Sequence, residues 1–461
     1  MAKNVVIFSD GTGQRSGLLF DERRSNIYKL YRATRCGPDS NIRPWEQLAF
    51  YDPGVGTLPA GVGFLAAVWH WIRNLVSQAT GLGITKNMID CYAAIIRMWE
   101  PGDRIFLFGF SRGAYTVLCL GGVIALCGIP AKMAGDKSLL RDETSTKRIA
   151  REAVKSVYQH TSPRKDEDAT PPQRELLEQR RALARRFRQT YGSDRNDGAN
   201  EYPYFIGVFD TVASLTNPMA VVSFAAIAII FLLISSFILS FLALSVLIWV
   251  GVLLGIAALG TLVAYLVTHI KVAFGLEGYN WWQTLHLTEA RMEFYDRDLN
   301  VHVGYARHAI SIDENRASFQ RVKWGIPRVE RDTGQGNPEW FEQLWFSGNH
   351  SDVGGSYPEN ESRLSDITMK WMSNEAIAAG LKVDASVLQL YPSAAGMQHD
   401  EYKSSIFRYA GRLDRDPPPD APLHESVYER FELKEVLQYD ETKPYRPRCL
   451  QMHADLQKYY L

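Results

Sequence analysis

The 461-residue sequence lacks several features that would point to a familiar class of protein. Its five cysteines are widely spaced and form no C-x-x-C pair, so neither a disulfide framework nor a zinc site is expected. It has no excess of charge of either sign, because Lys plus Arg and Asp plus Glu number 51 each. Without a basic excess, nucleic acid is not an expected partner. The N-terminal "MAKNVVIFSDGTGQ" lacks the apolar core of a signal peptide, which favours residence in the cytoplasm, at least at first.

Charged side chains are also missing from one long stretch. Residues 211–270 contain no Asp, Glu, Lys or Arg. Because about 20 apolar residues span a bilayer, this stretch has room for two transmembrane helices, expected at 219–241 and 246–268. A hairpin returns the chain to its starting side, so the flanking sequence can build one domain; a single tilted helix or a re-entrant pair is the alternative. We therefore expect a multi-pass membrane protein whose main domain faces the cytoplasm.

The sequence does contain a series of apolar segments that end in polar loops. Strands are expected in "NVVIFSDGTG", "LAFYDPGVGT", "DRIFLFGF", "YPYFIGVFDTV" and "EQLWFSGNHSDVGG". Helical periodicity occupies residues 63–100 and "SRGAYTVLCLGGVIALCG". This alternation predicts an α/β fold with a mostly parallel sheet and helices on both faces. Such sheets bind ligands at the carboxyl ends of their strands, which is where the polar loops lie.

Two insertions interrupt the expected domain. Its two halves are residues 1–138 and 273–461, the second including a tail, and residues 201–217 add a core strand with its polar loop. Residues 139–200 form a charged helical insertion, and residues 218–272 form the apolar hairpin. Within the charged insertion, "RELLEQRRALARRFRQTYG" is typical of a basic amphipathic helix, which serves either as a solvated face or as a contact with anionic lipid.

The stretch "LFGFSRGAYT" contains the pattern G-x-S-x-G around Ser111, which is typical of a nucleophile elbow between a strand and a helix. The backbone N–H of Arg112 and those of Gly11 and Thr12 in "SDGTG" are candidate donors to an oxyanion. The same Gly-rich loop also suits phosphate, but "DGTGQRSG" lacks the P-loop lysine and the full dinucleotide spacing. Asp10 is the candidate ligand for a divalent cation; otherwise no metal or cofactor is expected.

A nucleophilic serine needs a histidine as base and usually a carboxylate that orients the imidazole. In α/β-hydrolases these residues follow the order Ser, Asp or Glu, His. Two sets in this sequence satisfy the order, Ser111/Asp210/His350 and Ser111/Asp352/His424. The order of the residues leaves both sets open.

Six motifs, "VVIFSDGTGQ", "YDPGVGT", "GFSRGAY", "GVFDTV", "HAISIDENR" and "GNHSDVGGSYP", occur in an order that resembles a known family. The family is the catalytic domain of bacterial type VI secretion phospholipase effectors of the first lipase class, formerly a domain of unknown function. The resemblance covers about residues 3–360, and "LHESVYER" extends it to about 430. It implies an α/β-hydrolase-like serine esterase acting on phospholipid acyl esters, with Ser111 as nucleophile, Asp210 as acid and His350 as base. The apolar hairpin departs from the family pattern and favours a resident membrane protein or an inserting toxin.

We therefore expect a membrane-anchored serine hydrolase of the phospholipase A type. Its expected partners are membrane phospholipids and, in addition, either a second copy of the chain or a regulatory or immunity protein. Two rival interpretations are an esterase or thioesterase acting on small soluble esters, and a membrane-anchored binding or sensor protein on a degenerate hydrolase scaffold.

Overall fold

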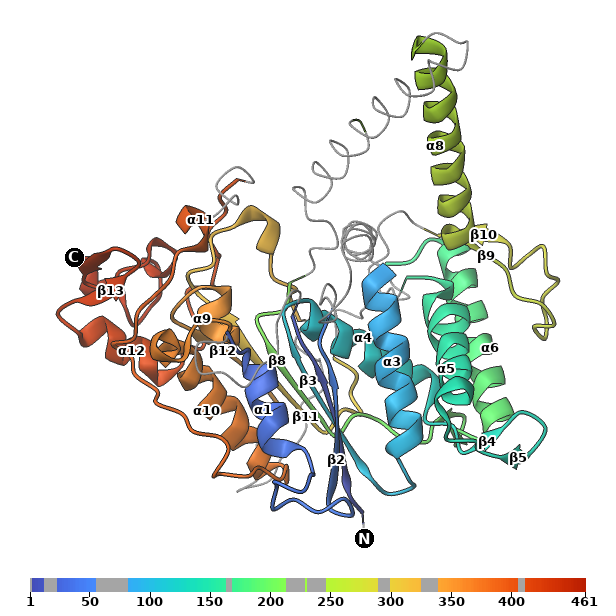
Figure 1. Ribbon diagram of the computed structural model, residues 1–461, viewed down its shortest axis with the longest axis horizontal. Coiled ribbons are helices and arrows are strands. Elements are labelled where there is room, and N and C mark those ends of the chain that lie inside the picture. The colour runs from blue at the N-terminus through green and yellow to red at the C-terminus, as the bar shows by residue number, and fades with distance from the viewer. Residues whose placement is uncertain are drawn as a thin grey trace.

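The computed structural model describes residues 2–11, 23–54, 82–162, 168–212, 229, 246–288, 299–324, 339–404 and 411–461. At the centre lies a six-stranded sheet with the order β12-β11-β8-β3-β1-β2, in which every neighbouring pair is parallel (Figure 1). The strands are β1 (Asn4–Ser9), β2 (Gln47–Asp52), β3 (Arg104–Phe110), β8 (Phe205–Phe209), β11 (Tyr305–Ser311) and β12 (Phe341–Phe346). The predicted α/β fold with a parallel sheet is confirmed.

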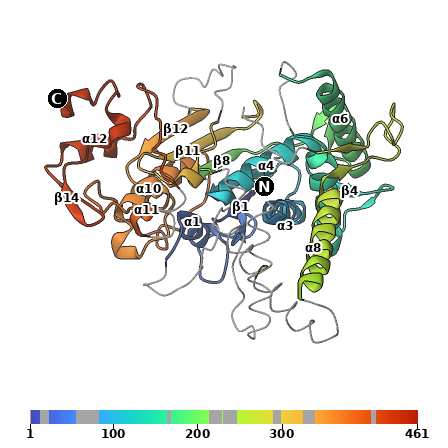
Figure 2. The same ribbon diagram turned by 90° about the horizontal axis from the view of Figure 1, so that it is seen from above.

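Helices cover both faces of the sheet (Figures 1 and 2). One face carries α3 (Leu82–Met98) and α4 (Arg112–Cys127), and outside them pack α5 (Glu143–Arg151) and α6 (Pro171–Tyr191). The other face carries α1 (Asn26–Thr34), α9 (His350–Gly354) and α10 (Arg363–Ala378). The described part of the charged region 139–200 contains α5 and α6, and the proposed domains and their boundaries stay a prediction.

The alternation of side chains along the strands explains why helices are needed on both faces. In β3, Ile105 and Leu107 point into the core beneath α3 and α4, whereas Phe106, Phe108 and Phe110 point into the core beneath α1 and α10. All five side chains are buried. A strand that is apolar on both faces needs helices packed against both faces. In the sequence, such a strand is a continuous apolar run.

Smaller elements complete the described chain. The remaining helices are η1 (Glu152–Val157), η2 (Tyr158–His160), α8 (Val246–His269), η3 (Ala317–Phe319), η4 (Glu359–Glu361), α11 (Glu401–Ser404), α12 (Glu425–Glu432), η6 (Arg448–Leu450) and η7 (Gln457–Tyr459). Four antiparallel two-stranded pairs are β4 (Lys132–Met133) with β5 (Lys137–Ser138), β6 (Asp194–Arg195) with β7 (Gly198–Ala199), β9 (Ile270–Lys271) with β10 (His286–Leu287), and β13 (Val436–Gln438) with β14 (Glu441–Lys443).

The C-terminal residues 411–461 pack beside the outer strand β12. Trp345 of β12 donates its N–H to the Pro422 carbonyl at 3.0 Å, and its own carbonyl accepts from the N–H of His424 at 3.0 Å. Trp345 also belongs to a buried apolar cluster with Val427 and Phe431. The C-terminal segment therefore covers the edge of the sheet and protects it from pairing with another chain.

Strand β11 was not predicted as a strand. Arg307 and His308 interrupt its apolar pattern, yet both side chains are buried. The Nε of Arg307 donates to Glu375 of α10 at 2.7 Å, and Nδ1 of His308 lies 3.1 Å from the side-chain oxygen of Gln343. Because these partners come from other elements, the local sequence does not reveal that the two polar residues are satisfied inside the fold.

The predicted membrane segments are corrected by the structure. Of the first expected span, 219–241, only Ile229 lies within the described residues, and the second, 246–268, coincides with α8. Among the described residues, no helix combines the length and the apolarity that crossing a membrane requires. The predictions of a transmembrane hairpin and of a membrane location with a cytoplasmic main domain are therefore wrong.

Candidate active site

Ser111 lies at the sharp turn between strand β3 and helix α4. Its backbone has φ 58° and ψ −121°, a region that residues other than glycine rarely occupy. The N–H of Ser111 donates to the carbonyl of Phe209 on the neighbouring strand β8 at 3.2 Å. The sheet therefore holds a strained serine backbone in place at its carboxyl edge.

The two glycines of the G-x-S-x-G pattern are required by close backbone packing. A Cβ atom on Gly109 would lie 2.6 Å from both the N and Cα atoms of Ala114. A Cβ atom on Gly113 would lie 2.5 Å from the carbonyl carbon of Ser9 and 2.6 Å from the carbonyl oxygen of Asp10. No side chain fits at either position, so the spacing seen in the sequence is the spacing that this turn needs.

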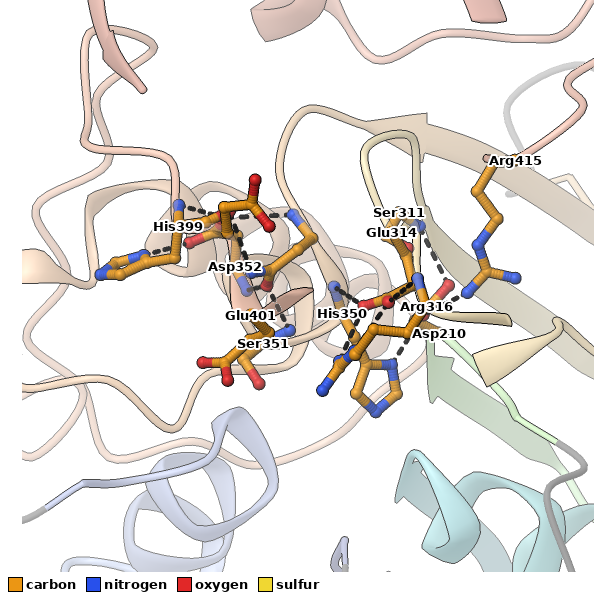
Figure 3. A network of polar contacts seen from close by, with 12 residues as sticks. Asp210, Ser311, Glu314, Arg316, His350, Ser351, Asp352, His399, Glu401 and Arg415 are labelled. Atoms are coloured by element: carbon orange, nitrogen blue, oxygen red, sulfur yellow. Dashed lines mark hydrogen bonds and ion pairs between the residues drawn. The ribbon is translucent and has the colours of Figure 1, made fainter. Parts of the chain in front are cut away.

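Asp210 and His350 form a buried hydrogen-bonded pair (Figure 3). Asp210 directly follows β8 and has φ 33°, and its side chain is fully buried. Its Oδ2 atom lies 2.7 Å from Nδ1 of His350 and accepts from Nη2 of Arg415 at 2.9 Å. Its Oδ1 atom accepts from the N–H of Ser311 at 3.1 Å. Both carboxylate oxygens are thus bonded, which fixes the orientation of Asp210 toward the imidazole.

The surroundings keep Asp210 ionised. Burial alone would raise the pKa of this carboxyl group, because the charged form loses its hydration. The nearby Arg415 guanidinium, the bond to His350 and the N–H of Ser311 outweigh burial and hold the pKa of Asp210 below its usual range. The pair therefore contains a carboxylate at neutral pH.

His350 begins the short helix α9, and its ring lies against the elbow. The ring stacks on Phe110, the residue before Ser111, with centroids 4.6 Å apart, and meets Phe319 edge-on at 5.1 Å. Within the described residues, no hydrogen bond joins the Ser111 hydroxyl to the His350 ring. Such bonds are often long in unliganded sites and tighten when substrate binds. The structure therefore brings Ser111, Asp210 and His350 to one edge of the sheet.

A second buried ion pair supports the backbone of His350. Glu314 accepts the N–H of His350 at 3.2 Å and is itself held by Arg316 through Nε at 2.8 Å and Nη2 at 2.7 Å. Burial opposes the charge of Glu314, but Arg316 keeps the pKa of the carboxyl group lowered. This pair was not predicted, although Glu314 and Arg316 belong to the "HAISIDENR" motif that carried part of the family resemblance.

The other candidate acid and base lie apart from each other. Asp352 bonds to a different histidine, His399, with 2.7 Å between Oδ1 and Nδ1, and its Oδ2 accepts the N–H of Asn349 at 3.0 Å. His424 caps helix α12, where its Nδ1 accepts the N–H of Ser426 at 3.2 Å. Asp352 thus has a local role at the start of α9, and the structure does not pair it with His424.

The loop after β1 packs against the elbow. A Cβ atom on Gly11 would lie 3.4 Å from Cβ of Ser111. However, the N–H of Gly11 donates to Oδ1 of Asp10 at 2.7 Å, so in this conformation it is already bonded. Thr12, the other predicted donor in this loop, lies outside the described residues.

Asp10, the candidate cation ligand, already has protein partners for both carboxylate oxygens. In addition to the Gly11 contact, its Oδ2 accepts from the hydroxyls of Ser25 at 2.5 Å and Tyr51 at 2.7 Å. Burial raises the pKa of Asp10 to about 6. Within the described ranges, no three His, Cys, Asp or Glu side chains gather as a metal site would require. Within the described residues, Asp10 therefore accepts hydrogen bonds from Gly11, Ser25 and Tyr51.

Comparison with known proteins shows similarity to one family. The model for the "T6SS, Phospholipase effector Tle1-like, catalytic domain" matches residues 3–375. An uncharacterized protein of Saccharomyces cerevisiae (YEL023C) is 29% identical over 220 residues, which is 46% of this chain and 27% of the yeast protein.

Two solved structures are more distant. An uncharacterized protein from Pseudomonas aeruginosa aligns with a TM-score of 0.37 and 16% identity over 85% of this chain and 48% of its own. The Tle1 effector bound to the VgrG spike of the type 6 secretion system aligns with a TM-score of 0.29 and 15% identity over 79% of this chain and 52% of its own. The chain thus spans about a quarter of the length of the yeast relative and about half of each solved chain.

Proposed function

The chain belongs to the Tle1-like phospholipase effector family through its catalytic domain, and we propose that it hydrolyses carboxylic (acyl) esters of phospholipids with Ser111, His350 and Asp210. The family resemblance that the sequence motifs indicated is confirmed. The single observation that carries the proposed chemistry is the buried Asp210–His350 pair, which lies beside a serine in a strained elbow.

In the proposed reaction, His350 acts as base and Ser111 as nucleophile. The bond from Nδ1 to Asp210 holds the imidazole in the tautomer that leaves the Nε2 lone pair free. Nε2 takes the proton of Ser111 Oγ as this oxygen attacks the ester carbonyl carbon. When the tetrahedral intermediate collapses, the ester C–O bond breaks and the proton passes from His350 to the departing alcohol oxygen. Water then repeats these steps on the acyl-serine and releases the fatty acid.

Stabilisation of the intermediate is assigned to the N-terminus of α4. Arg112 is the first residue of this helix, and N–H groups in the first turn have no partner within the helix. These groups and the helix dipole favour negative charge, as an oxyanion requires. Gly11 lies close enough to supply a second donor, but only after its N–H leaves Asp10.

The strand order supports an α/β-hydrolase-like placement of the site. Strand β1 lies between β2 and β3, so the chain reverses its direction of travel across the sheet at the border of β1 and β3. Ligands of open α/β sheets bind at such a switch point, beyond the carboxyl ends of the strands. Gly11 follows β1 and Ser111 follows β3.

The proposal favours Asp210 and His350 over Asp352 and His424. The first pair is hydrogen-bonded and buried beside Ser111, whereas Asp352 is bonded to His399 and His424 caps a helix in the C-terminal segment. A nucleophile needs its base within hydrogen-bonding reach, and the His350 ring contacts the residue next to Ser111.

The test is release of fatty acid from phospholipid vesicles by the wild type and by Ser111→Ala. We expect Ser111→Ala to abolish the release while its unfolding midpoint stays close to that of the wild type. Ser193→Ala is the matched control, because this buried hydroxyl donates to the Cys127 carbonyl at the far end of α4. This control should retain activity per folded molecule. Hydrolysis by Ser111→Ala at the wild-type rate, or hydrolysis of short-chain soluble esters but not of vesicles, would contradict the proposal.

A further inference from the structure

Arg415 reaches Asp210 from a part of the chain that the family match does not include. The match ends at residue 375, and Arg415 lies in the described C-terminal segment 411–461. Its Nη2 donates to Oδ2 of Asp210 at 2.9 Å, and the two side chains are 5% and 0% exposed. Figure 3 shows Arg415 and His350 both directed at this carboxylate.

The contact involves the oxygen that also bonds to the histidine. Oδ2 of Asp210 carries both His350 Nδ1 and Arg415 Nη2, while Oδ1 carries the Ser311 N–H. The Arg415 bond is charge-assisted, which makes it shorter and stronger than a bond between neutral groups. Removing Arg415 would leave Oδ2 with the imidazole alone and would remove the cation that is bonded to this buried carboxylate.

We propose that Arg415 is a positioning residue for ester hydrolysis, which holds the Asp210 carboxylate ionised and aligned with His350. The C-terminal segment is then part of the active unit and not only a cover for the edge of the sheet. This role presupposes the proposed function of Ser111, His350 and Asp210. Arg415 does not contact the reacting ester; it acts through Asp210.

The hydrogen bonds of Arg415 differ from those of Arg188, a buried arginine away from the candidate site. Arg188 uses all three guanidinium nitrogens, which donate to Asp194, to the Leu126 carbonyl and to the Asp197 carbonyl at 2.8–2.9 Å. In contrast, Nε and Nη1 of Arg415 are buried and have no hydrogen-bond partner among the described residues. Burying unpaired donors costs free energy, so the burial of the Arg415 side chain needs a compensating interaction. The bond to Asp210 is the interaction that explains it.

Other titratable groups around the pair do not replace Arg415. His308 lies near Asp210, but burial lowers the pKa of its imidazole to about 4, so it is neutral at pH 7. Glu314 near His350 is neutralised by Arg316. Arg321 interacts electrostatically with both Arg415 and Asp210. Its guanidinium, however, lies over the Trp345 ring, 4.9 Å from the ring centroid. Within the described residues, Arg415 is the cation bonded directly to Asp210.

The test compares Arg415→Met and Arg415→Lys with the wild type in the rate of vesicle hydrolysis as a function of pH. In Arg415→Met, we expect kcat to fall about 10- to 100-fold with little change in KM, because geometry and not substrate binding is lost. We also expect the acid limb of the profile to move to higher pH, because Arg415 no longer lowers the pKa of the Asp210 carboxyl group. Arg415→Lys should restore the limb, since it keeps the charge.

Arg188→Met is the matched control for a merely structural effect. It removes a buried arginine with three partners and should lower the unfolding midpoint without moving the acid limb. If Arg415→Met has the kcat of the wild type per folded molecule and the same acid limb in its pH–rate profile, the positioning role is overturned. If Arg415→Met does not fold, the pH–rate profile of Arg415→Lys is the test. This variant keeps the positive charge, so an acid limb shifted from that of the wild type would also overturn the positioning role.

A spectroscopic readout separates this inference from the proposed function. The proton between Nδ1 of His350 and Asp210 should give a far-downfield NMR resonance in the wild type, and this resonance should shift or disappear in Arg415→Met. An unchanged resonance overturns the positioning role even if the wild type hydrolyses phospholipids. A changed resonance supports the positioning of the Asp210–His350 pair by Arg415, even if the wild type does not hydrolyse vesicles and the proposed substrate class is wrong.

Discussion

Substitution of Gly113 by alanine tests whether the elbow geometry is as tight as the structure indicates. The added Cβ atom would lie 2.5 Å from the Ser9 carbonyl carbon, whereas real Cβ atoms stay at least 3.0 Å from such neighbours. The Ser9 carbonyl oxygen is closer still, 1.0 Å inside that limit, so the start of α4 must move by about 1 Å. Both contacting groups are backbone, so no side chain can rotate to relieve the overlap. We expect a loss of about 1–3 kcal/mol in the free energy of unfolding.

The same movement should affect catalysis. A misplacement of about 1 Å costs roughly 100-fold in rate, so kcat should fall by a factor of this order. The assays are urea unfolding and vesicle hydrolysis. Gly121→Ala is the matched control on the same helix, because its Cβ atom would meet Ile206 at an ordinary 3.4 Å. Alanine is preferred to glycine in helices, so this control should gain up to about 1 kcal/mol. Equal stability and activity of the two variants would refute the steric reasoning.

Three further predictions concern the carboxylates. Asp210→Asn should lower kcat by roughly 10³- to 10⁴-fold because the amide no longer fixes the His350 tautomer; a loss under tenfold in vesicle hydrolysis would contradict this role. Asp352→Asn should cost about 1–3 kcal/mol in urea unfolding through the bond to His399 and should lower kcat per folded molecule less than tenfold, whereas a loss equal to that of Asp210→Asn would identify Asp352 as the acid. Burial raises the pKa of Asp313 from 3.8 to about 6, so its stabilising contribution is full below pH 3.8 and is lost as the pH rises to 6. The stability of the wild type relative to Asp313→Asn should therefore fall by about 2 kcal/mol between pH 4 and 6, and a constant difference would show that the carboxyl group is not perturbed.

Much of the sheet was predictable because its strands are apolar on both faces. Strands β1, β3 and β8 appear in the sequence as uninterrupted apolar runs that end in polar loops. The elbow was predictable for a similar reason, since the steric demands at Gly109 and Gly113 leave a pattern within five residues. Short-range physical constraints of this kind are visible in a single sequence.

Long-range partners were not predictable. Arg415 bonds to a residue 205 positions earlier, and Arg307 in β11 bonds to Glu375, 68 positions later. In sequence, each of these arginines looks like an ordinary surface residue, because its carboxylate partner is contributed by another element. The same limitation left two candidate acids open, and only the fold distinguishes the carboxylate bonded to His350 from the one bonded to His399.

The wrong prediction of membrane helices has a different origin. The absence of charged residues from 211–270 reports composition, whereas a membrane span also needs a continuous apolar helix of sufficient length. Among the described residues, no helix meets both conditions.

We propose that Ser111 is an activated nucleophile beside the Asp210–His350 pair. The most direct measurement is mass-spectrometric mapping of the adduct formed by a fluorophosphonate probe on the folded wild type and on His350→Ala. We expect a single adduct on Ser111 in the wild type and labelling at least 100-fold slower in His350→Ala, because the base is lost. An adduct on another residue, or equally fast labelling of the two proteins, would contradict it.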